Sequence, residues 1–119
     1  MNWYLAKMVY QIICGDGKHP AQFDEQLRLV NASDYSDAFC KSREIGVNEE
    51  DNFLNYVNKP VRWKFIDVSE IYFLDKLVDG AEVYSRIHEE DNAEKYIRSI
   101  EARAAYLVET AAERSLALN

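Results

Sequence analysis

The stretch QFDEQLRLV, residues 22–30, is the clearest strand pattern in this chain of 119 residues. Apolar and polar side chains alternate along it, which predicts a β-strand with one apolar and one polar face. The apolar set is Phe23, Leu27 and Leu29, and the polar set is Asp24, Gln26 and Arg28. We expect the polar face to be solvated or to hold polar interactions.

The segment before this stretch predicts a second strand over residues 3–14. Its two alternate faces are both largely apolar, which is typical of a central strand that is covered on both sides. Gly15, Asp16 and Gly17 then supply the positive φ angles that a turn needs. We therefore expect residues 3–14 and 22–31 to form an antiparallel hairpin.

A helix is predicted to begin near Ser33 and Asp34, whose side-chain oxygens can cap free backbone amides. Gly46 is a candidate C-cap of this helix. Apolar and small residues at spacings of three and four predict its buried stripe: Tyr35, Ala38, Phe39, Ser42 and Ile45. The stretch 48–58, with its acids followed by Phe53, Leu54, Tyr56 and Val57, is compatible with a short helix or an ordered loop.

The second half of the chain predicts two strands and a helix. A third strand covers residues 61–68, with a continuation to Leu74 through a bulge near Ser69 as an alternative. Alternation predicts a fourth strand over residues 81–88. The last helix is expected to begin near Asp91, which forms a capping-box pattern with Glu94. Its apolar stripe comprises Ala93, Tyr96, Ile97, Ile100, Ala104 and Leu107.

The resulting order, β-β-α-β-β-α, predicts an α+β fold, a mainly antiparallel four-stranded sheet with helices packed on one face. We expect a single domain over residues 1–110 and a helical or frayed C-terminal tail over 111–119. The second sheet face keeps apolar residues from the first strand and from the neighbourhood of Trp63 and Phe65. An uncovered apolar face of this kind favours a homodimer that packs through it or through an edge strand.

The charge of the chain restricts its partners. It carries 14 basic and 21 acidic residues, a net charge of −7 and a pI near 4.8. Nucleic acid and anionic membranes are disfavoured, because both require clustered Lys and Arg. The acidity serves solubility or attracts a basic protein partner. Since no signal peptide and no apolar stretch of membrane-spanning length is evident, we expect a cytoplasmic protein.

Catalytic and metal-binding patterns are not recognisable in the sequence. Cys14 and Cys40 are expected to be buried thiols, with a disulfide left open. His19 and His88 stand in contexts that suggest no nucleophile–base pair. The acidic runs 49–51 and 89–91 consist of consecutive residues, which do not converge on one ion. We therefore expect no metal, no cofactor and no catalytic residue.

One polar row is a candidate ligand-binding site. On the predicted fourth strand, Glu82, Tyr84 and Arg86 share a face. The candidates to join them are Asp67, Glu70 and Trp63 on the third strand and Asp24, Gln26 and Arg28 on the second. Arg86, with its planar set of donors, would anchor an anion or carboxylate. The alternative is a set of cross-strand charge pairs that face water.

Four blocks carry a resemblance to a known family: WYLAK at residues 3–7, QFDEQLRL at 22–29, WKF at 63–65 and DGAE at 79–82. The chain resembles the bacterial domain-of-unknown-function family 4288 over roughly residues 3–107. The resemblance implies a small stand-alone cytosolic protein. It carries over no catalytic or binding residue.

The sequence as a whole favours a non-catalytic protein-interaction module. The alternative is a small-molecule-binding protein or modest enzyme of the dimeric α+β type, with the polar row near Trp63 and Tyr84 as its pocket.

Overall fold

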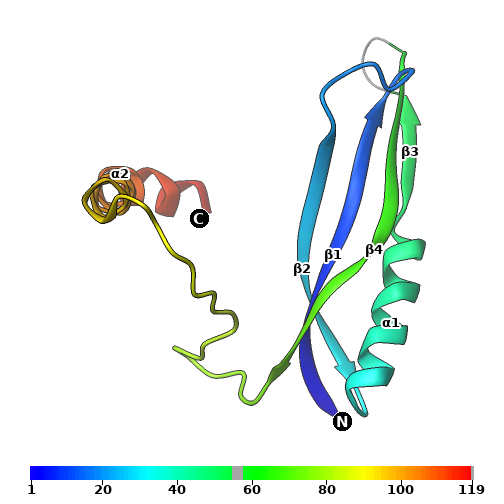
Figure 1. Cartoon of the computed structure of the whole chain (residues 1–119), viewed down its shortest axis with the longest axis horizontal. Coiled ribbons are helices and arrows are strands. Elements are labelled where there is room, and N and C mark those ends of the chain that lie inside the picture. The colour runs from blue at the N-terminus through cyan, green and yellow to red at the C-terminus, as the bar shows by residue number, and fades with distance from the viewer. Residues whose placement is uncertain (55–57, 119) are drawn as a thin grey trace. The chain divides into compact units, whose positions relative to one another are not determined.

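The computed structural model describes residues 1–54 and 58–118. The chain divides into two compact units, and the boundary between them in the sequence follows Ser85. The first unit is a curved antiparallel sheet with one helix, and the second contains a single long helix (Figure 1). We describe each unit by itself. The elements are β1 Asn2–Cys14, β2 Gln22–Ala32, α1 Tyr35–Asn48, β3 Asp51–Leu54, β4 Pro60–Leu74 and α2 Ala93–Leu118.

The sheet consists of three long strands and a short edge strand, in the order β2-β1-β4-β3, with antiparallel neighbours throughout. β1 is interior, as its two apolar faces predict. The predicted hairpin of β1 and β2 is confirmed, and its turn contains positive φ angles at Gly15 and Gly17. The bulge near Ser69 is also confirmed, because Lys7 pairs with Glu70 while the next residue of β1 pairs with Val68.

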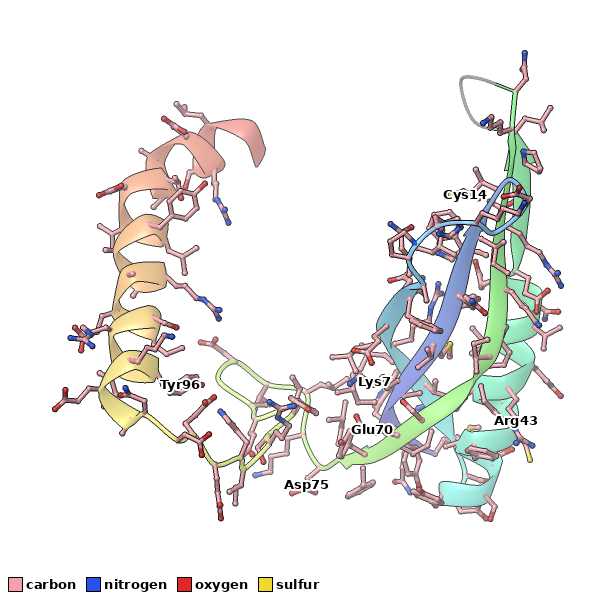
Figure 2. The ribbon with its side chains drawn as sticks, turned by 45° about the horizontal axis from the view of Figure 1, so that its top comes forward. Lys7, Cys14, Arg43, Glu70, Asp75 and Tyr96 are labelled. Atoms are coloured by element: carbon pink, nitrogen blue, oxygen red, sulfur yellow. The ribbon has the colours of Figure 1, made fainter. Side chains whose placement is uncertain are left out.

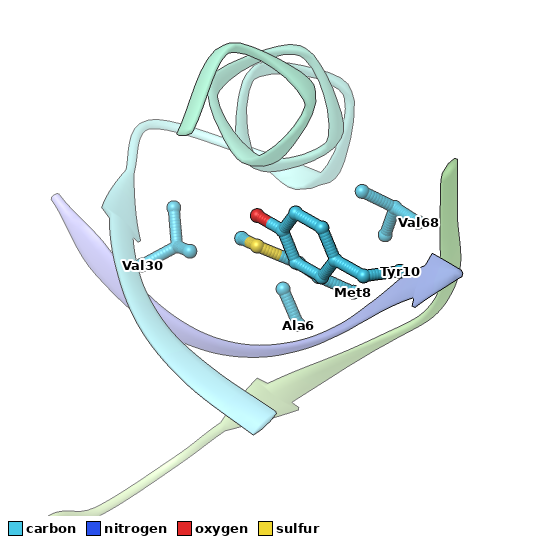
Figure 3. Packing of buried hydrophobic residues seen from close by; sticks show 5 residues of the cluster. All are labelled: Ala6, Met8, Tyr10, Val30 and Val68. Carbon is cyan, nitrogen blue, oxygen red and sulfur yellow. The ribbon is translucent and has the colours of Figure 1, made fainter. Parts of the chain in front are cut away.

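The core lies between the sheet and α1 (Figure 3). Alternate residues of β1 point to this side and are almost completely buried there. β2 and β4 each add a buried valine to the same cluster, whose members are Ala6, Met8, Tyr10, Val30 and Val68. α1 contacts β1, β2 and β4 and so holds one face of the sheet.

Helix α1 begins as the sequence predicts. Asp34 is its N-cap, and Oδ1 of Asp34 accepts a hydrogen bond of 2.8 Å from the backbone amide of Asp37. Ala38 and Ser42 are buried against the sheet, and the Ser42 hydroxyl donates to the carbonyl of Ala38 at 2.7 Å. Small side chains thus let the helix approach the strands closely. Tyr35, predicted in the buried stripe, is instead exposed.

Gly46 does not end α1, contrary to the sequence prediction. The helix continues to Asn48, with Glu49 as its C-cap. Gly46 is buried, the ring of Phe65 lies against its Cα, and the Tyr10 hydroxyl donates to its carbonyl at 2.8 Å. A close approach between helix and sheet, rather than a turn, therefore requires glycine here.

The α+β class is confirmed, but the strands of the sheet are not the four that the sequence predicts, and the predicted third strand is the fourth one along the chain. Residues 81–88 form no strand, and the short strand β3 pairs with β4 where a short helix or loop was expected. A strand exists only where a neighbouring backbone accepts its hydrogen bonds, and side-chain alternation does not provide that neighbour. Tyr56 and Val57 lie outside the described residues.

The second unit contains α2, whose cap is one residue later than predicted. Oδ1 of Asn92, not the Asp91 side chain, accepts a hydrogen bond of 3.0 Å from the Lys95 amide. The His88 ring packs edge-on against Tyr96, with centroids 5.2 Å apart. The helix continues through the Ala-rich segment after residue 110. A single domain over residues 1–110 stays a prediction.

Both cysteines are free thiols. Cys14 is half-buried at the end of β1, whereas Cys40 is exposed on α1. The prediction of two buried thiols is therefore wrong for Cys40, which lies outside the buried positions of its helix.

Candidate functional site

The face of the sheet that points away from α1, called here the open face, carries a group of large apolar side chains. Cross-strand register places Leu5, Lys7 and Gln11 of β1 on this face, opposite Leu29, Leu27 and Phe23 of β2. Five large apolar residues of the open face remain between 41% and 56% exposed: Trp3, Phe23, Leu27, Leu29 and Ile66. Exposed apolar area of this extent on a regular sheet is typical of an interaction surface.

Ile66 reaches the open face because β4 is irregular at this point. Val9 pairs with Asp67 and Tyr10 pairs with Phe65, so Ile66 has no partner of its own on β1. Phe65 packs against the core and Asp67 bonds to α1, which turns the intervening side chain outward. The second bulge of β4 thus adds an apolar residue to the open face.

A charged triple lies in the middle of the open face. Nζ of Lys7 is 3.7 Å from a carboxylate oxygen of Glu25 on β2 and 3.6 Å from one of Glu70 on β4. Figure 2 shows Lys7 and Glu70 on this side of the sheet. The Lys7 side chain is only 21% exposed, because its stem lies among the apolar neighbours. These ion pairs therefore link β1 to β2 and to β4, and they place charged groups in the middle of the apolar open face.

The segment after β4 covers one end of the open face. The Tyr84 ring packs edge-on against Tyr72, with centroids 5.5 Å apart, and Leu5 and Leu74 are nearly buried there. Burial, followed by a hydrogen bond with Glu70, raises the pKa of Tyr72 above its usual value. The apolar part of the open face around Leu27 remains exposed.

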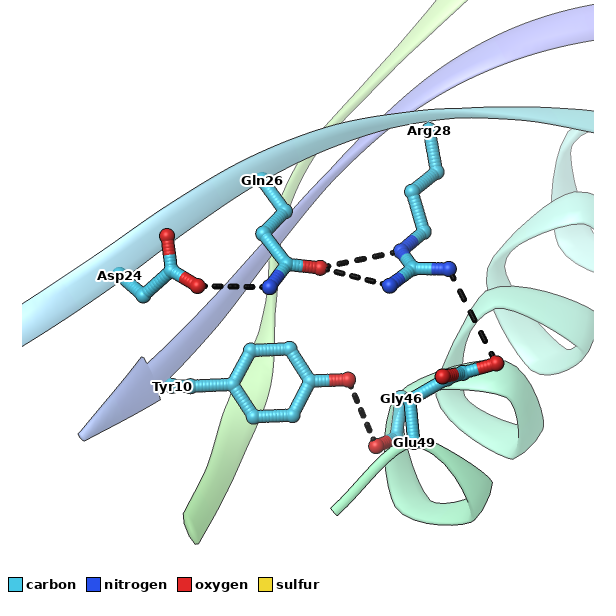
Figure 4. Close-up of polar contacts among 6 residues, drawn as sticks. All are labelled: Tyr10, Asp24, Gln26, Arg28, Gly46 and Glu49. Carbon is cyan, nitrogen blue, oxygen red and sulfur yellow. Dashed lines mark hydrogen bonds and ion pairs between the residues drawn. The ribbon is translucent and has the colours of Figure 1, made fainter. Parts of the chain in front are cut away.

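The opposite face holds the polar residues of β2 (Figure 4). Oδ2 of Asp24 accepts from Nε2 of Gln26 at 2.6 Å, and Oε1 of Gln26 accepts from Nη2 of Arg28 at 2.8 Å. Arg28 also forms a long ion pair of 3.9 Å with Glu49, just after the last turn of α1. Hydrogen bonds and one ion pair thus connect this polar row of β2 to the end of α1. The polar groups bond to one another within the protein.

The predicted site residues do not come together as one site. Trp63 donates from Nε1 to Asp24 at 3.2 Å on the helix side of the sheet, and Asp67 pairs with Arg43 of α1. Tyr84 packs on Tyr72 at the open face instead.

The strand on which Glu82, Tyr84 and Arg86 were to share a face is absent. Glu82 is exposed in the first unit, and Arg86 is exposed in the second. Ligand binding by these five residues stays a prediction. The strand over residues 81–88, from which it was argued, does not form.

The pairing of Asp67 with Arg43 predicts a pH dependence of stability. Hydrogen bonds from Arg43 and from the Val68 amide hold the pKa of Asp67 below its usual value. The resulting stabilisation is present above the unfolded pKa of about 3.9 and is lost as the pH falls through the lowered pKa. Asp67→Asn should therefore lower the free energy of unfolding at pH 7 by less than about 1 kcal/mol, because the pair is half-exposed.

Urea unfolding of wild type and Asp67→Asn between neutral and acidic pH measures this effect. The difference between the two proteins should shrink toward zero in acid, whereas the exposed control Asp79→Asn should follow wild type throughout. A difference of constant size at every pH would contradict the assignment.

The sequence predicted which side chains of β2 form its apolar set. It did not predict that this set lies on the face away from α1, or that Lys7 forms ion pairs with Glu25 and Glu70. The alternation of β2 could not tell which set faces the helix. The one available signal for Lys7 was a cation within an otherwise apolar strand, and its partners come from other strands.

Comparison with known proteins adds the family. Within residues 1–54 and 58–118, neither helix combines the length and apolar character that crossing a membrane requires. No curated protein and no solved structure matches the chain. Residues 3–85 match the family described as a domain of unknown function (DUF4288), a shorter region than the resemblance over residues 3–107. This match covers the sheet, α1 and the open face, and on it the chain belongs to the DUF4288 family.

Proposed function

We propose that this protein is a non-catalytic protein-interaction module that pairs its open face with the open face of a second copy. The observation that carries the proposal is the exposure of Phe23, Leu27 and Leu29 on one side of β2. They lie on a regular sheet face that α1, packed on the opposite side of the sheet, does not cover. Two such faces pack about 10 Å apart in known sheet sandwiches, with interdigitating side chains.

The scaffold of the open face supports this role. β1, at its centre, is hydrogen-bonded on both sides and anchored from behind by Met8 and Tyr10 in the core. A rigid face loses little conformational entropy on binding, which favours association. When two open faces pair, Lys7 would be enclosed together with its partners Glu25 and Glu70, so this cation is not buried alone.

The charge of the chain influences the choice of partner. The net charge of −7 makes two copies of the chain repel each other. A stable pair therefore depends on the apolar contact between the two open faces. The same charge would speed encounter with a basic protein, which is the alternative partner for this face.

Leu27→Asp tests the proposal. The substitution replaces an apolar side chain in the centre of the proposed interface by a third carboxylate beside Lys7, whose charge Glu25 and Glu70 already balance. We expect self-association to weaken by about tenfold or more. Val47→Asp is the matched control, because Val47 is an exposed aliphatic residue on α1, away from the open face. Sedimentation equilibrium of the three proteins measures the association constants.

A local readout ties the result to the open face. In wild type, the methyl resonances of Leu29 should shift with protein concentration, and in Leu27→Asp the same shift should require about tenfold higher concentration or more. Methyl resonances of Val47 should stay constant in both. Leu29 signals that are independent of concentration in the wild-type protein would reject pairing through this face.

A further inference from the structure

Strand β2 forms a long free edge of the sheet. It is the last strand in the order β2-β1-β4-β3, so the backbone groups of alternate residues along it face away from β1. Residues 22–32 pair with β1 in one continuous register, without a bulge and without a proline. Within the residues that the structure describes, one side chain bonds to this backbone, that of Lys41, at Asn31 near the end of the strand. Such an edge is a template for a strand of another chain.

The other edge of the sheet is protected by its own side chains. β3 pairs with β4 only at residues 60–63. Beyond that, the Phe65 amide donates to Oε1 of Glu50 at 3.1 Å, and the Val68 amide donates to Oδ1 of Asp67 at 2.8 Å. Two bulges also interrupt the register of β4. Among the described strands, β2 therefore offers the regular free edge, and edge-to-edge assembly ends at two copies.

We propose that the β2 strands of two copies pair antiparallel about Gln26 and join the two sheets into one continuous sheet. A two-fold axis perpendicular to the sheet relates the copies, so both open faces lie on the same side. Asp24 then lies opposite Arg28 of the second copy, and Arg28 lies opposite Asp24 of the second copy. This contact uses the edge of β2 and is distinct from the pairing of open faces.

Charge complementarity selects this register. Asp24, Gln26 and Arg28 lie on the helix side of β2, with Gln26 between the two charges (Figure 4). Oδ2 of Asp24 accepts the hydrogen bonds from Gln26 and Trp63. Within the described part of the chain, no hydrogen bond reaches Oδ1 of Asp24, which leaves this oxygen for the guanidinium of the second copy. Opposite charges on directly opposed residues stabilise strand pairing, and the two-fold axis provides this pair twice.

Neighbouring registers lack the match. A pair of strands centred on residue 24, 25 or 28 sets a charged side chain opposite its own copy, where like charges repel. A pair centred on Leu27 sets the carboxylate of Asp24 opposite Val30, so it meets no cation there.

The open-face side of the same register brings apolar side chains together. Phe23 lies opposite Leu29 of the second copy at both ends of the contact, and each is more than half exposed in the single chain. Between them Glu25 lies opposite Leu27 and keeps its ion pair with Lys7 of its own chain. Pairing of the edges thus covers apolar area as well as backbone groups.

Cross-linking at the centre of the contact tests the proposal. Gln26→Cys, in a chain with Cys14→Ser and Cys40→Ser, should form an intermolecular disulfide with copper–phenanthroline as oxidant, because directly opposed Cα atoms lie about 4.5–5.5 Å apart. Gln22→Cys is the matched control on the same side of β2, since these residues would be about 26 Å apart in the pair. Gln26→Cys should react about tenfold faster or more.

This readout separates the edge from the open face. When two open faces pair, residue 26 points to opposite outer sides of the sandwich, so that contact does not form the disulfide. Equal rates for Gln26→Cys and Gln22→Cys would overturn the proposal, whatever the result for the open face.

A mixing experiment tests the register by charge. Asp24→Arg and Arg28→Asp, each combined with Gln26→Cys in the same background, should each cross-link with themselves about tenfold more slowly, because like charges then oppose each other. In an equimolar mixture, each arginine of one variant meets an aspartate of the other, so the mixed disulfide should form at about the rate of the parent chain. A general effect of net charge would instead speed the self-reaction of Asp24→Arg, which is less acidic than the parent.

Mass spectrometry identifies the mixed disulfide, and circular dichroism checks that both variants keep the sheet. If a charge variant does not fold, the comparison of Gln26→Cys with Gln22→Cys decides the proposal by itself. A mixture of folded variants without preference for the mixed disulfide would overturn the register about Gln26.

Discussion

Met8→Ala should lower the free energy of unfolding by about 2–5 kcal/mol, the range found for removing a long buried side chain. Met8 is fully buried in the middle of β1, within the cluster that includes Tyr10, Val30 and Val68 (Figure 3). β1 is held on both sides by other strands, so the backbone cannot collapse into the cavity that the substitution leaves. Thermal unfolding should occur at least about 10 °C lower in a unit of this size.

Met8→Leu is the matched control for this prediction. It keeps the volume and apolar character of the side chain, so it should cost less than about 1.5 kcal/mol. Urea unfolding followed by tryptophan fluorescence reports on both variants. A loss below about 1 kcal/mol for Met8→Ala would contradict the described core, because it would mean that the side chain is not enclosed.

Local signals predicted much of the first unit. The alternation in residues 22–30, the glycines of the hairpin turn, the cap at Asp34 and the bulge near Ser69 depend on neighbours in the chain, and each is confirmed. Such features can be predicted because propensity and turn chemistry act over a few residues.

What could not be predicted depends on contacts between distant residues. Residues 81–88 alternate as a strand does, yet no strand of the sheet pairs with them. Conversely, residues 51–54 pair with β4, although a segment of this length is too short to carry a periodic signal. Strand pairing is a property of the whole fold, and alternation alone is compatible with several partners.

The candidate site shows the same limit. The sequence predicted an uncovered apolar face and assigned the ligand site to a polar row that includes Glu82 and Arg86. The open face that is present consists of residues from β1, β2 and β4, and its central charge, Lys7, finds its partners 18 and 63 residues along the chain, in Glu25 and Glu70. Only the register of three strands brings these residues together.

Gly46→Val should lower the free energy of unfolding by about 3 kcal/mol, at the upper end of the cost of inserting atoms into a packed core. Gly46 has ordinary helical backbone angles, since the positive φ angles among the glycines belong to residues 15, 17 and 80. The constraint is space: a Cβ at this position would lie between 2.2 and 2.7 Å from three ring atoms of Phe65. Helix propensity favours valine over glycine by only a few tenths of a kcal/mol, so the clash decides the sign.

A double-mutant cycle with Phe65→Ala tests the cause of this effect. If the Phe65 ring is the obstacle, Gly46→Val should cost at most about 1 kcal/mol in the Phe65→Ala background, a coupling of about 2 kcal/mol between the two positions. The single variant Phe65→Ala will itself be less stable, because it opens a cavity beside Tyr10. An additive cycle would mean that α1 does not approach β4 as closely as the Gly46 contact requires. The cycle therefore measures the contact between α1 and β4. Ile66 and Glu70 lie on the opposite side of the same strand, on the open face.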